Sequence, residues 1–206
     1  MMKRFKNLTL ERALPWILII GGVLGMIAAF IITVEKIHLL QDPHYVPNCN
    51  LNPVISCGSV MASKQSNAFG FPNPFVGLAA FPVLITTGVV MLMVGVAKFK
   101  RWYMLALQAG TVFGLLFVHW LFYQSTYHIN ALCPYCIAVW IITITTFWYV
   151  LLYNMRAKYI RLTGKGAAVG AFLQKHHLDI LVLWFLIILA LILKHFWYYY
   201  GPHLGL

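Results

Sequence analysis

Negative charge is nearly absent from this sequence, in which four Asp and Glu residues stand against 15 Lys and Arg. Charged residues make up 9% of the 206 positions, compared with about 25% in soluble globular proteins. Hydrophobic residues make up 62%. This balance excludes a soluble globular protein. No acidic residue falls in the middle of an apolar run, which argues against ion-coupled transport.

The sequence contains several long hydrophobic runs. Each is about 20 residues long, the length that a helix needs to cross the hydrocarbon core of a bilayer. They predict one all-α integral membrane domain over residues 1–206, with transmembrane helices at 14–34, 75–97, 102–123, 134–153 and 178–196. The first run follows basic residues, as in a signal peptide, but it is too long and lacks a convincing cleavage site. We therefore expect it to be retained.

The positive charge is distributed unevenly along the chain. Twelve of the 15 Lys and Arg lie before the first run, between the second and third runs, or between the fourth and fifth. The positive-inside rule predicts that these clusters face the cytoplasm, with the N-terminus, and that the C-terminus is extracytoplasmic. The clusters flank membrane runs and contain few interleaved aromatics, so they indicate contact with membrane lipid and no nucleic-acid partner.

Cysteine is scarce too, and all four residues fall on one predicted side of the membrane. Cys49 and Cys57 lie in a loop at 41–74, where Pro and Gly residues predict short helical pieces joined by irregular structure. Cys133 and Cys136 open the fourth run. Both places face away from the cytoplasm, where disulfides form and persist. We expect the loop to pack as a lid over the helices.

The stretch "CPYC" places a thiol pair at a helix start. Pro134 suits the first position of a helix, which makes Cys133 the N-cap and puts Cys136 one turn inside. Backbone N–H groups and the helix dipole favour a thiolate there. Together with Cys49 and Cys57, this pair suffices for a relay by thiol–disulfide exchange, from an aqueous dithiol to a lipid-soluble acceptor.

Three other interpretations of the cysteines compete with a relay. The four residues can form two structural disulfides that staple the loops of a non-catalytic transporter or scaffold. A four-cysteine zinc site commonly uses two short knuckles, and the C-x7-C spacing of the loop pair is a poor one. The c-type haem signature needs His directly after the second cysteine, where this sequence has Ile137.

Several of these elements together resemble the vitamin K epoxide reductase family, in its prokaryotic quinone-reducing branch. They are "CNLNPVISC" in the loop, "GSVMAS" after it, "FGFPNPFVG" at the second run and "CPYC" at the fourth, in an order that also agrees. The resemblance covers roughly residues 12–200. It implies a four-helix bundle around a quinone (ubiquinone or menaquinone), an outer fifth helix and an extracytoplasmic cap loop.

The resemblance also implies a role for each cysteine. Electrons would enter at Cys49 from a partner thiol, and the reduced loop pair would attack a disulfide between Cys133 and Cys136. A disulfide between Cys57 and Cys133 would be the intermediate. Cys136 would then be the thiolate beside the quinone ring. The product would be a quinol, and the pathway would support disulfide bond formation.

Three further residues are implied to bind the quinone or seat the cap. Asn73 matches a polar residue that hydrogen-bonds a quinone carbonyl. Trp140, one turn beyond Cys136, matches an aromatic residue that lines the ring. Ser63 matches a loop position that helps to seat the cap. Because animal members have Tyr at the position of Trp140, quinone reduction is favoured over epoxide reduction.

The partner and the location follow from the same resemblance. Many bacterial members carry a thioredoxin-like domain after the fifth helix, and this sequence stops at Leu206. A separate DsbA-like thioredoxin-fold protein is therefore expected to donate the electrons, at the cell inner (cytoplasmic) membrane. In the unrelated DsbB-type oxidases, which perform equivalent chemistry, the two cysteine pairs come in the opposite order.

Two features inside the runs are interpreted as packing features. Gly21, Gly22 and Gly25 in the first run are predicted to allow close helix packing. His119 lies in the third run, where an ionisable side chain is costly unless it has a partner. We expect it to make a hydrogen bond to another helix.

Overall fold

A computed structural model, which describes residues 2–42 and 44–203, is helical and contains no β-strand in this part of the chain. Five helices are long and apolar enough to cross a membrane. They are α1 (Met2–Gln41), α3 (Pro74–Val94), α4 (Arg101–Tyr123), α5 (Pro134–Arg156) and α7 (His177–His195). The predicted all-α fold with five membrane helices is confirmed, and the protein is a multi-pass membrane protein.

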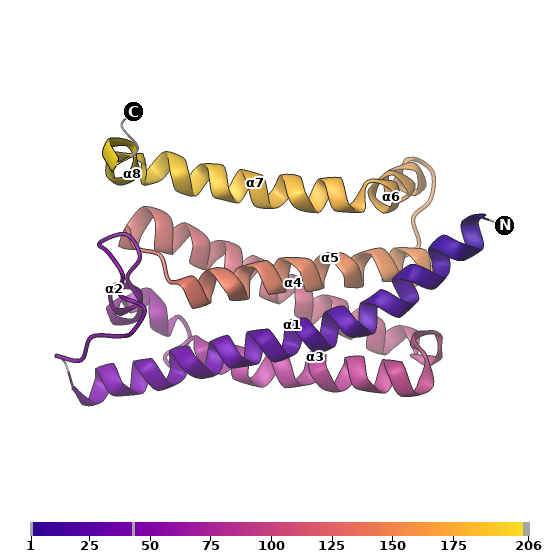
Figure 1. Cartoon of the computed structure of the whole chain (residues 1–206). Coiled ribbons are helices and arrows are strands. Elements are labelled where there is room, and N and C mark those ends of the chain that lie inside the picture. The colour runs from indigo at the N-terminus through magenta and orange to yellow at the C-terminus, as the bar shows by residue number, and fades with distance from the viewer. Residues whose placement is uncertain (1, 43, 204–206) are drawn as a thin grey trace.

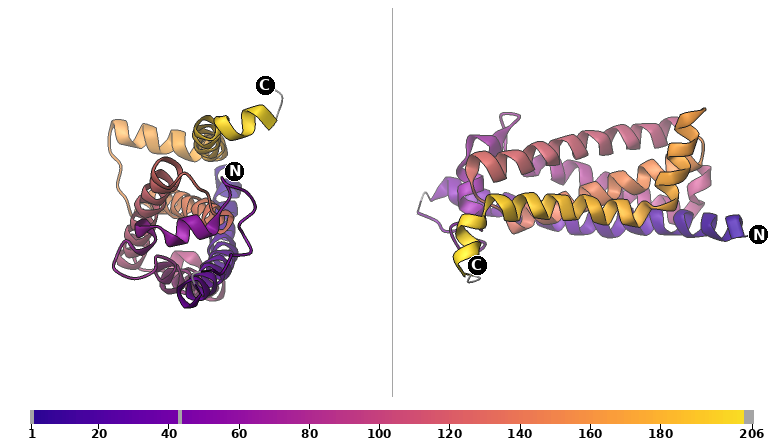
Figure 2. Two further views of the ribbon diagram at one scale, coloured as in Figure 1. Left: turned by 90° about the vertical axis from the view of Figure 1, so that its left-hand side faces the viewer. Right: turned by 90° about the horizontal axis from the view of Figure 1, so that it is seen from above.

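Four of these helices form a bundle and the fifth lies outside it (Figure 1). Helix α1 packs against α3 and α5, and α4 packs against α5. Helix α7 runs along the outer side of the bundle in Figure 1 and in the left view of Figure 2, and Leu181 is the one α7 residue that the described structure buries. Trp184 of α7 donates a hydrogen bond of 3.1 Å to His119 of α4. The interhelical partner predicted for His119 is confirmed.

Helices α1, α4 and α5 extend beyond the predicted apolar runs, whereas α3 ends at Val94, three residues before its predicted end, because the chain turns at Gly95 with a positive φ. Helix α1 continues seven residues past Val34, because the polar side chains of Glu35 and Lys36 are buried against the loop that follows. Helix α4 continues as a π-helical segment, η3 (Gln124–Ile129), where a short connection was expected. The chain also forms η2 (Val96–Lys98), α6 (Lys165–Lys175) and α8 (Trp197–His203), none of which the sequence predicted.

Small residues let α1 and α3 approach closely. A Cβ atom on Gly22 would lie 2.6 Å from the Ile85 side chain and 3.2 Å from backbone atoms of α3. The third predicted packing glycine, Gly21, faces α5, where its Cβ would lie 3.3 Å from Ile142. The packing role predicted for these glycines is confirmed.

Gly25 gives the sharpest test of this packing. In Gly25→Ala, the new Cβ would lie 2.3 to 2.7 Å from atoms of the buried Phe81 ring, so the ring or the helices must shift. We expect a loss of about 1–3 kcal/mol in the free energy of unfolding, the usual cost of overpacking. Thermal unfolding in detergent measures it. Gly110→Ala is the matched control, because no atom other than those of the adjacent backbone lies within 4 Å of its added Cβ. Equal effects of the two substitutions would contradict the packing argument.

Candidate active site

The loop between α1 and α3 covers one end of the bundle, called here the cysteine end (Figure 1). It contains α2 (Cys57–Ala62) and η1 (Lys64–Asn67). The N-terminus, α6 and the turn between α3 and α4 lie at the opposite end of the bundle.

A single β-bridge aligns the two segments that carry the cysteines. Ile55 and Leu132 form an isolated parallel bridge. The Leu132 N–H donates to the carbonyl of Val54 at 2.7 Å, and the Ser56 N–H donates to the carbonyl of Leu132 at 3.0 Å. Because Cys57 and Cys133 each follow the bridge within two residues, they are brought side by side.

The four cysteines are brought together as two contacting pairs. Cys49 and Cys57 form a disulfide, and Cys133 and Cys136 are free thiols. The sulfur of Cys57 lies 3.3 Å from that of Cys133. Cys49 is 7% exposed, whereas Cys57 and Cys133 are each 1% exposed. Cys49 is therefore the loop cysteine nearer to solvent, and the contact between the pairs is sealed from it.

The start of α5 has the geometry predicted for "CPYC". Cys133 is the N-cap of α5, and Pro134 occupies its first turn. A hydrogen bond from the side chain of Cys136 lowers the pKa of the Cys133 thiol, aided by the backbone N–H groups of Cys136 and Tyr135 and opposed by burial. The thiol of Cys133, next to the disulfide, therefore ionises more readily than an ordinary cysteine thiol.

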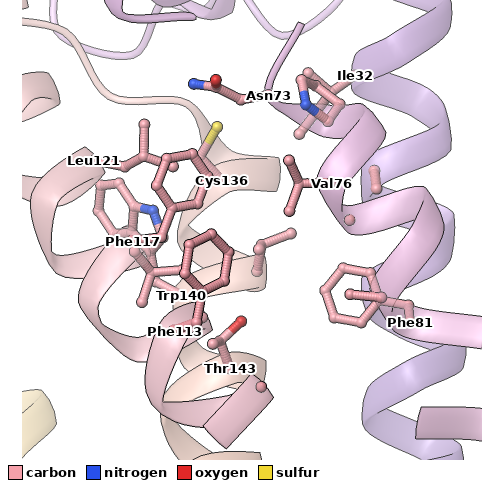
Figure 3. Close-up of a pocket in the computed structure, with 18 of the residues that line it drawn as sticks. Ile32, Asn73, Val76, Phe81, Phe113, Phe117, Leu121, Cys136, Trp140 and Thr143 are labelled. Atoms are coloured by element: carbon pink, nitrogen blue, oxygen red, sulfur yellow. The ribbon is translucent and has the colours of Figure 1, made fainter. Parts of the chain in front are cut away.

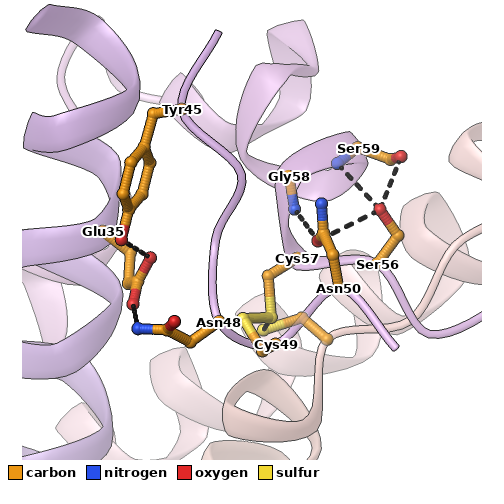
Figure 4. Close-up of a disulfide and its surroundings, with 10 residues drawn as sticks. Glu35, Tyr45, Asn48, Cys49, Asn50, Ser56, Cys57, Gly58 and Ser59 are labelled. Atoms are coloured by element: carbon orange, nitrogen blue, oxygen red, sulfur yellow. Dashed lines mark hydrogen bonds between the residues drawn. A yellow bond between two sulfur atoms is a disulfide. The ribbon is translucent and has the colours of Figure 1, made fainter. Parts of the chain in front are cut away.

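Two loop amides and a buried carboxylate hold the disulfide in place (Figure 4). The Asn50 side-chain oxygen accepts a hydrogen bond from the Gly58 N–H at 2.9 Å, at the start of α2. Glu35 of α1 accepts from the Tyr45 hydroxyl at 2.9 Å and from the Asn48 amide at 3.3 Å. These bonds fix the chain on both sides of Cys49.

An apolar cavity of about 550 Å³ lies inside the bundle below the loop. This volume is within the range of roughly 300–1,000 Å³ that is usual for small-molecule sites. Figure 3 shows Cys136 and Asn73 at one end of the cavity, with Phe117 and Trp140 farther in. Helices α1, α3, α4 and α5 all contribute to its walls. Cys136 thus links the thiol pairs to the cavity.

The three predicted binding residues all line this cavity, although their binding roles stay predictions. Trp140 is buried and meets Phe122 edge to face, with ring centroids 5.7 Å apart. Ser63 ends α2, and its hydroxyl donates to the carbonyl of Val60 at 2.7 Å. The Asn73 amide donates to the Gln65 carbonyl at 2.8 Å and accepts from the Ala68 N–H at 2.9 Å. One amide hydrogen of Asn73 remains for a ligand.

Two residues of the site were missed by the sequence analysis. Glu35 and Lys36 are adjacent on α1 and both are buried. Lys36 donates hydrogen bonds to the Met61 carbonyl and, at 3.3 Å, to the Ser66 hydroxyl. The available signal was their occurrence together directly after an apolar run, where ionisable residues are costly and often functional.

The arrangement of the cysteines and the cavity defines the class of the protein. A membrane protein in which a disulfide touches a second thiol pair, at the mouth of an apolar cavity, fits a thiol oxidoreductase. Within the described residues, no three His, Cys, Asp or Glu side chains come together as metal ligands.

The family is established by a comparison with known protein families. Residues 16–151 match the family model described as the Vitamin K epoxide reductase family, and the chain belongs to that family. The matched part includes both cysteine pairs and the walls of the cavity. A comparison with curated proteins finds no match.

Proposed function

We propose that this protein is a quinone-dependent thiol oxidoreductase that generates disulfides. It takes electrons from a thioredoxin-fold protein at Cys49 and Cys57, passes them to Cys133 and Cys136, and reduces a quinone in the cavity. The observation that carries the proposal is the 3.3 Å contact between the sulfurs of Cys57 and Cys133, at the mouth of an apolar cavity.

Exchange between the pairs proceeds through two substitutions at sulfur. The Cys57 thiolate attacks Cys133 of the inner disulfide, which forms the Cys57–Cys133 bond and releases Cys136 as a thiolate. Cys49 then attacks Cys57 and releases Cys133. The products are an outer disulfide and an inner dithiol, the state that the structure holds. Electrons are conserved because one disulfide is broken and one is formed.

The inner pair then reduces the ligand of the cavity. A bound quinone supplies an acceptor for two electrons and two protons. Cys136 faces the cavity and gives up the electrons, Cys133 closes the new disulfide with Cys136, and the two thiols provide the protons. Trp140 and Phe117 supply flat apolar surface for a ring. Burial beneath the loop keeps water from the reacting sulfur atoms.

A lipid-soluble substrate has a lateral path into this cavity. Helices α3 and α4 scarcely approach each other, unlike the other neighbouring helices of the bundle. Val83 of α3 and Trp102 and Phe113 of α4 line the cavity and are each half exposed or more. Because this side of the bundle faces lipid, the gap favours an acceptor that diffuses within the membrane.

The donor and the orientation are proposed on the same basis. Cys49 is the more accessible loop cysteine, and Val46 and Leu51 beside it expose about 70% of their surface. They offer an apolar contact for a DsbA-like partner in trans. The basic clusters lie at the opposite end of the bundle, which favours a cytoplasmic N-terminus and an extracytoplasmic cysteine end in the inner membrane.

Quinone reduction by the purified protein tests the proposal. A reduced DsbA-like protein is the donor, and ubiquinone and menaquinone analogues are the acceptors. We expect quinol to form in step with partner disulfide. If no donor supports turnover and all four cysteines stay paired under mild reductant, the cysteines are structural staples and the proposal is wrong.

Asn73 gives a second test, directed at the cavity. Asn73→Ala removes the free amide hydrogen that we expect to bond a quinone carbonyl, and it should weaken quinone binding by about 1–3 kcal/mol. Equilibrium titration with a quinone measures the affinity. Asn50→Ala is the control, because it also removes loop hydrogen bonds but does not line the cavity. If both variants bind equally well, Asn73 does not contact the ligand.

A further inference from the structure

One buried charge at the cavity has no role in the relay just described. Among the residues that line the cavity in the described structure, Lys36 is the one with a formally charged side chain. It is 6% exposed and lies in the membrane helix α1. An ammonium group is removed from water there at a cost of several kcal/mol unless it is compensated.

The contacts of Lys36 compensate for only part of this cost. Its ammonium group donates to the Met61 carbonyl and the Ser66 hydroxyl, which are both uncharged. No carboxylate forms an ion pair with it within the described residues. The neighbouring Glu35 is directed to Tyr45 and Asn48 instead. A buried cation without a counter-ion, beside a cavity, indicates a ligand that carries negative charge.

The same short helix connects Lys36 to the end of the cavity where reduction is proposed. Ser66 of η1 accepts from Lys36 through its hydroxyl, and its backbone carbonyl accepts from the Asn73 N–H at 2.9 Å. The Asn73 side chain bonds to Gln65 of that helix. Lys36 and Asn73 are therefore both hydrogen-bonded to η1, and Cys136 lines the same end of the cavity as Asn73.

We infer that Lys36 stabilises the negative charge that develops on a quinone oxygen during its reduction, and that it therefore favours anionic ligands in the cavity. This inference rests on the proposed function. Cys133 and Cys136 give up two electrons and two protons, and the quinone takes up both. If the electrons move before the protons, the third hydrogen of the Lys36 ammonium group donates a hydrogen bond to the negatively charged quinone oxygen. The other two hydrogens bond to Met61 and Ser66 of the loop.

The test compares two ligands of similar size and different charge. The compound 2-hydroxy-1,4-naphthoquinone is an anion at neutral pH, and 2-methyl-1,4-naphthoquinone is neutral. Titration of the purified full-length protein by tryptophan fluorescence gives the affinity of each. We expect Lys36→Gln to lower the anion-to-neutral affinity ratio about tenfold, the size of a modest charged hydrogen bond. Lys36→Arg, which keeps the charge, should retain most of the ratio.

A control separates the charge of Lys36 from its contact with the lid. Ser66→Ala removes a lid contact but leaves the charge, so it should weaken both ligands alike and keep their ratio. Equal weakening of both ligands in Lys36→Gln, or no change in either, would overturn the inference and leave Lys36 as an anchor of the loop. If the wild-type protein binds neither naphthoquinone, the proposed quinone site itself is wrong, and this inference fails with it.

Discussion

Cys136→Ala is expected to abolish quinone reduction, lowering the turnover number by a factor on the order of 10³ or more, as removal of a reacting nucleophile does in enzymes. Cys136 is the one cysteine that lines the cavity of the described structure, so it is the thiol positioned to deliver electrons there. Quinol formation with a reduced partner, followed by absorbance, measures the effect.

The same variant should still react with the partner. The hydrogen bonds of Asn48 and Asn50 that hold the loop around Cys49 are kept, because neither involves Cys136. One round of partner oxidation by the Cys49–Cys57 disulfide is therefore expected to survive. Quinone reduction at the wild-type rate in Cys136→Ala would show that electrons leave by another route.

Cys49→Ala is expected to have the second large effect on turnover, and the size of the effect should depend on which thiol compound donates the electrons. Cys49 is 7% exposed and Cys57 is 1% exposed, so a protein thiol reaches the relay at Cys49. Turnover with the thioredoxin-fold partner should be lost. A small permeant dithiol can reduce the inner pair directly, so some activity with dithiothreitol should remain. Parallel assays with the two donors measure the difference.

Cys57→Ala is the companion variant for this prediction. It removes the sulfur that contacts Cys133, so transfer between the pairs should stop. Cys49 is then a free thiol that offers a reduced partner no disulfide to attack, so turnover with the thioredoxin-fold partner should be lost while some activity with dithiothreitol remains. Equal loss of both donor activities in Cys49→Ala would contradict an ordered relay from the outer pair to the inner pair.

Features that depend on local sequence were predictable. The five membrane helices follow from the lengths of their apolar runs, and the place of Cys133 at the start of α5 follows from the Pro134 after it. The close approach of α1 and α3 follows from glycines within one helix. In each case the controlling residues lie within a few turns of each other, so a pattern along the chain is sufficient.

Features that depend on contacts between distant segments were not predictable from the residues alone. The contact of Cys57 with Cys133 joins positions 76 apart, and it is set by the bridge between Ile55 and Leu132, two apolar residues with no distinctive pattern. Glu35 and Lys36 resemble an ordinary polar helix end in the sequence. Their burial depends on how the loop folds back over α1, which no local pattern encodes.

The most direct test of the relay uses the variant with both Cys49→Ala and Cys136→Ala, which leaves Cys57 and Cys133 as the only cysteines. After mild oxidation in detergent, mass spectrometry of its peptides shows whether the two are joined. The proposed exchange predicts a nearly complete Cys57–Cys133 disulfide, because these sulfurs are already 3.3 Å apart. Two free thiols in a folded protein would contradict transfer of electrons between the pairs.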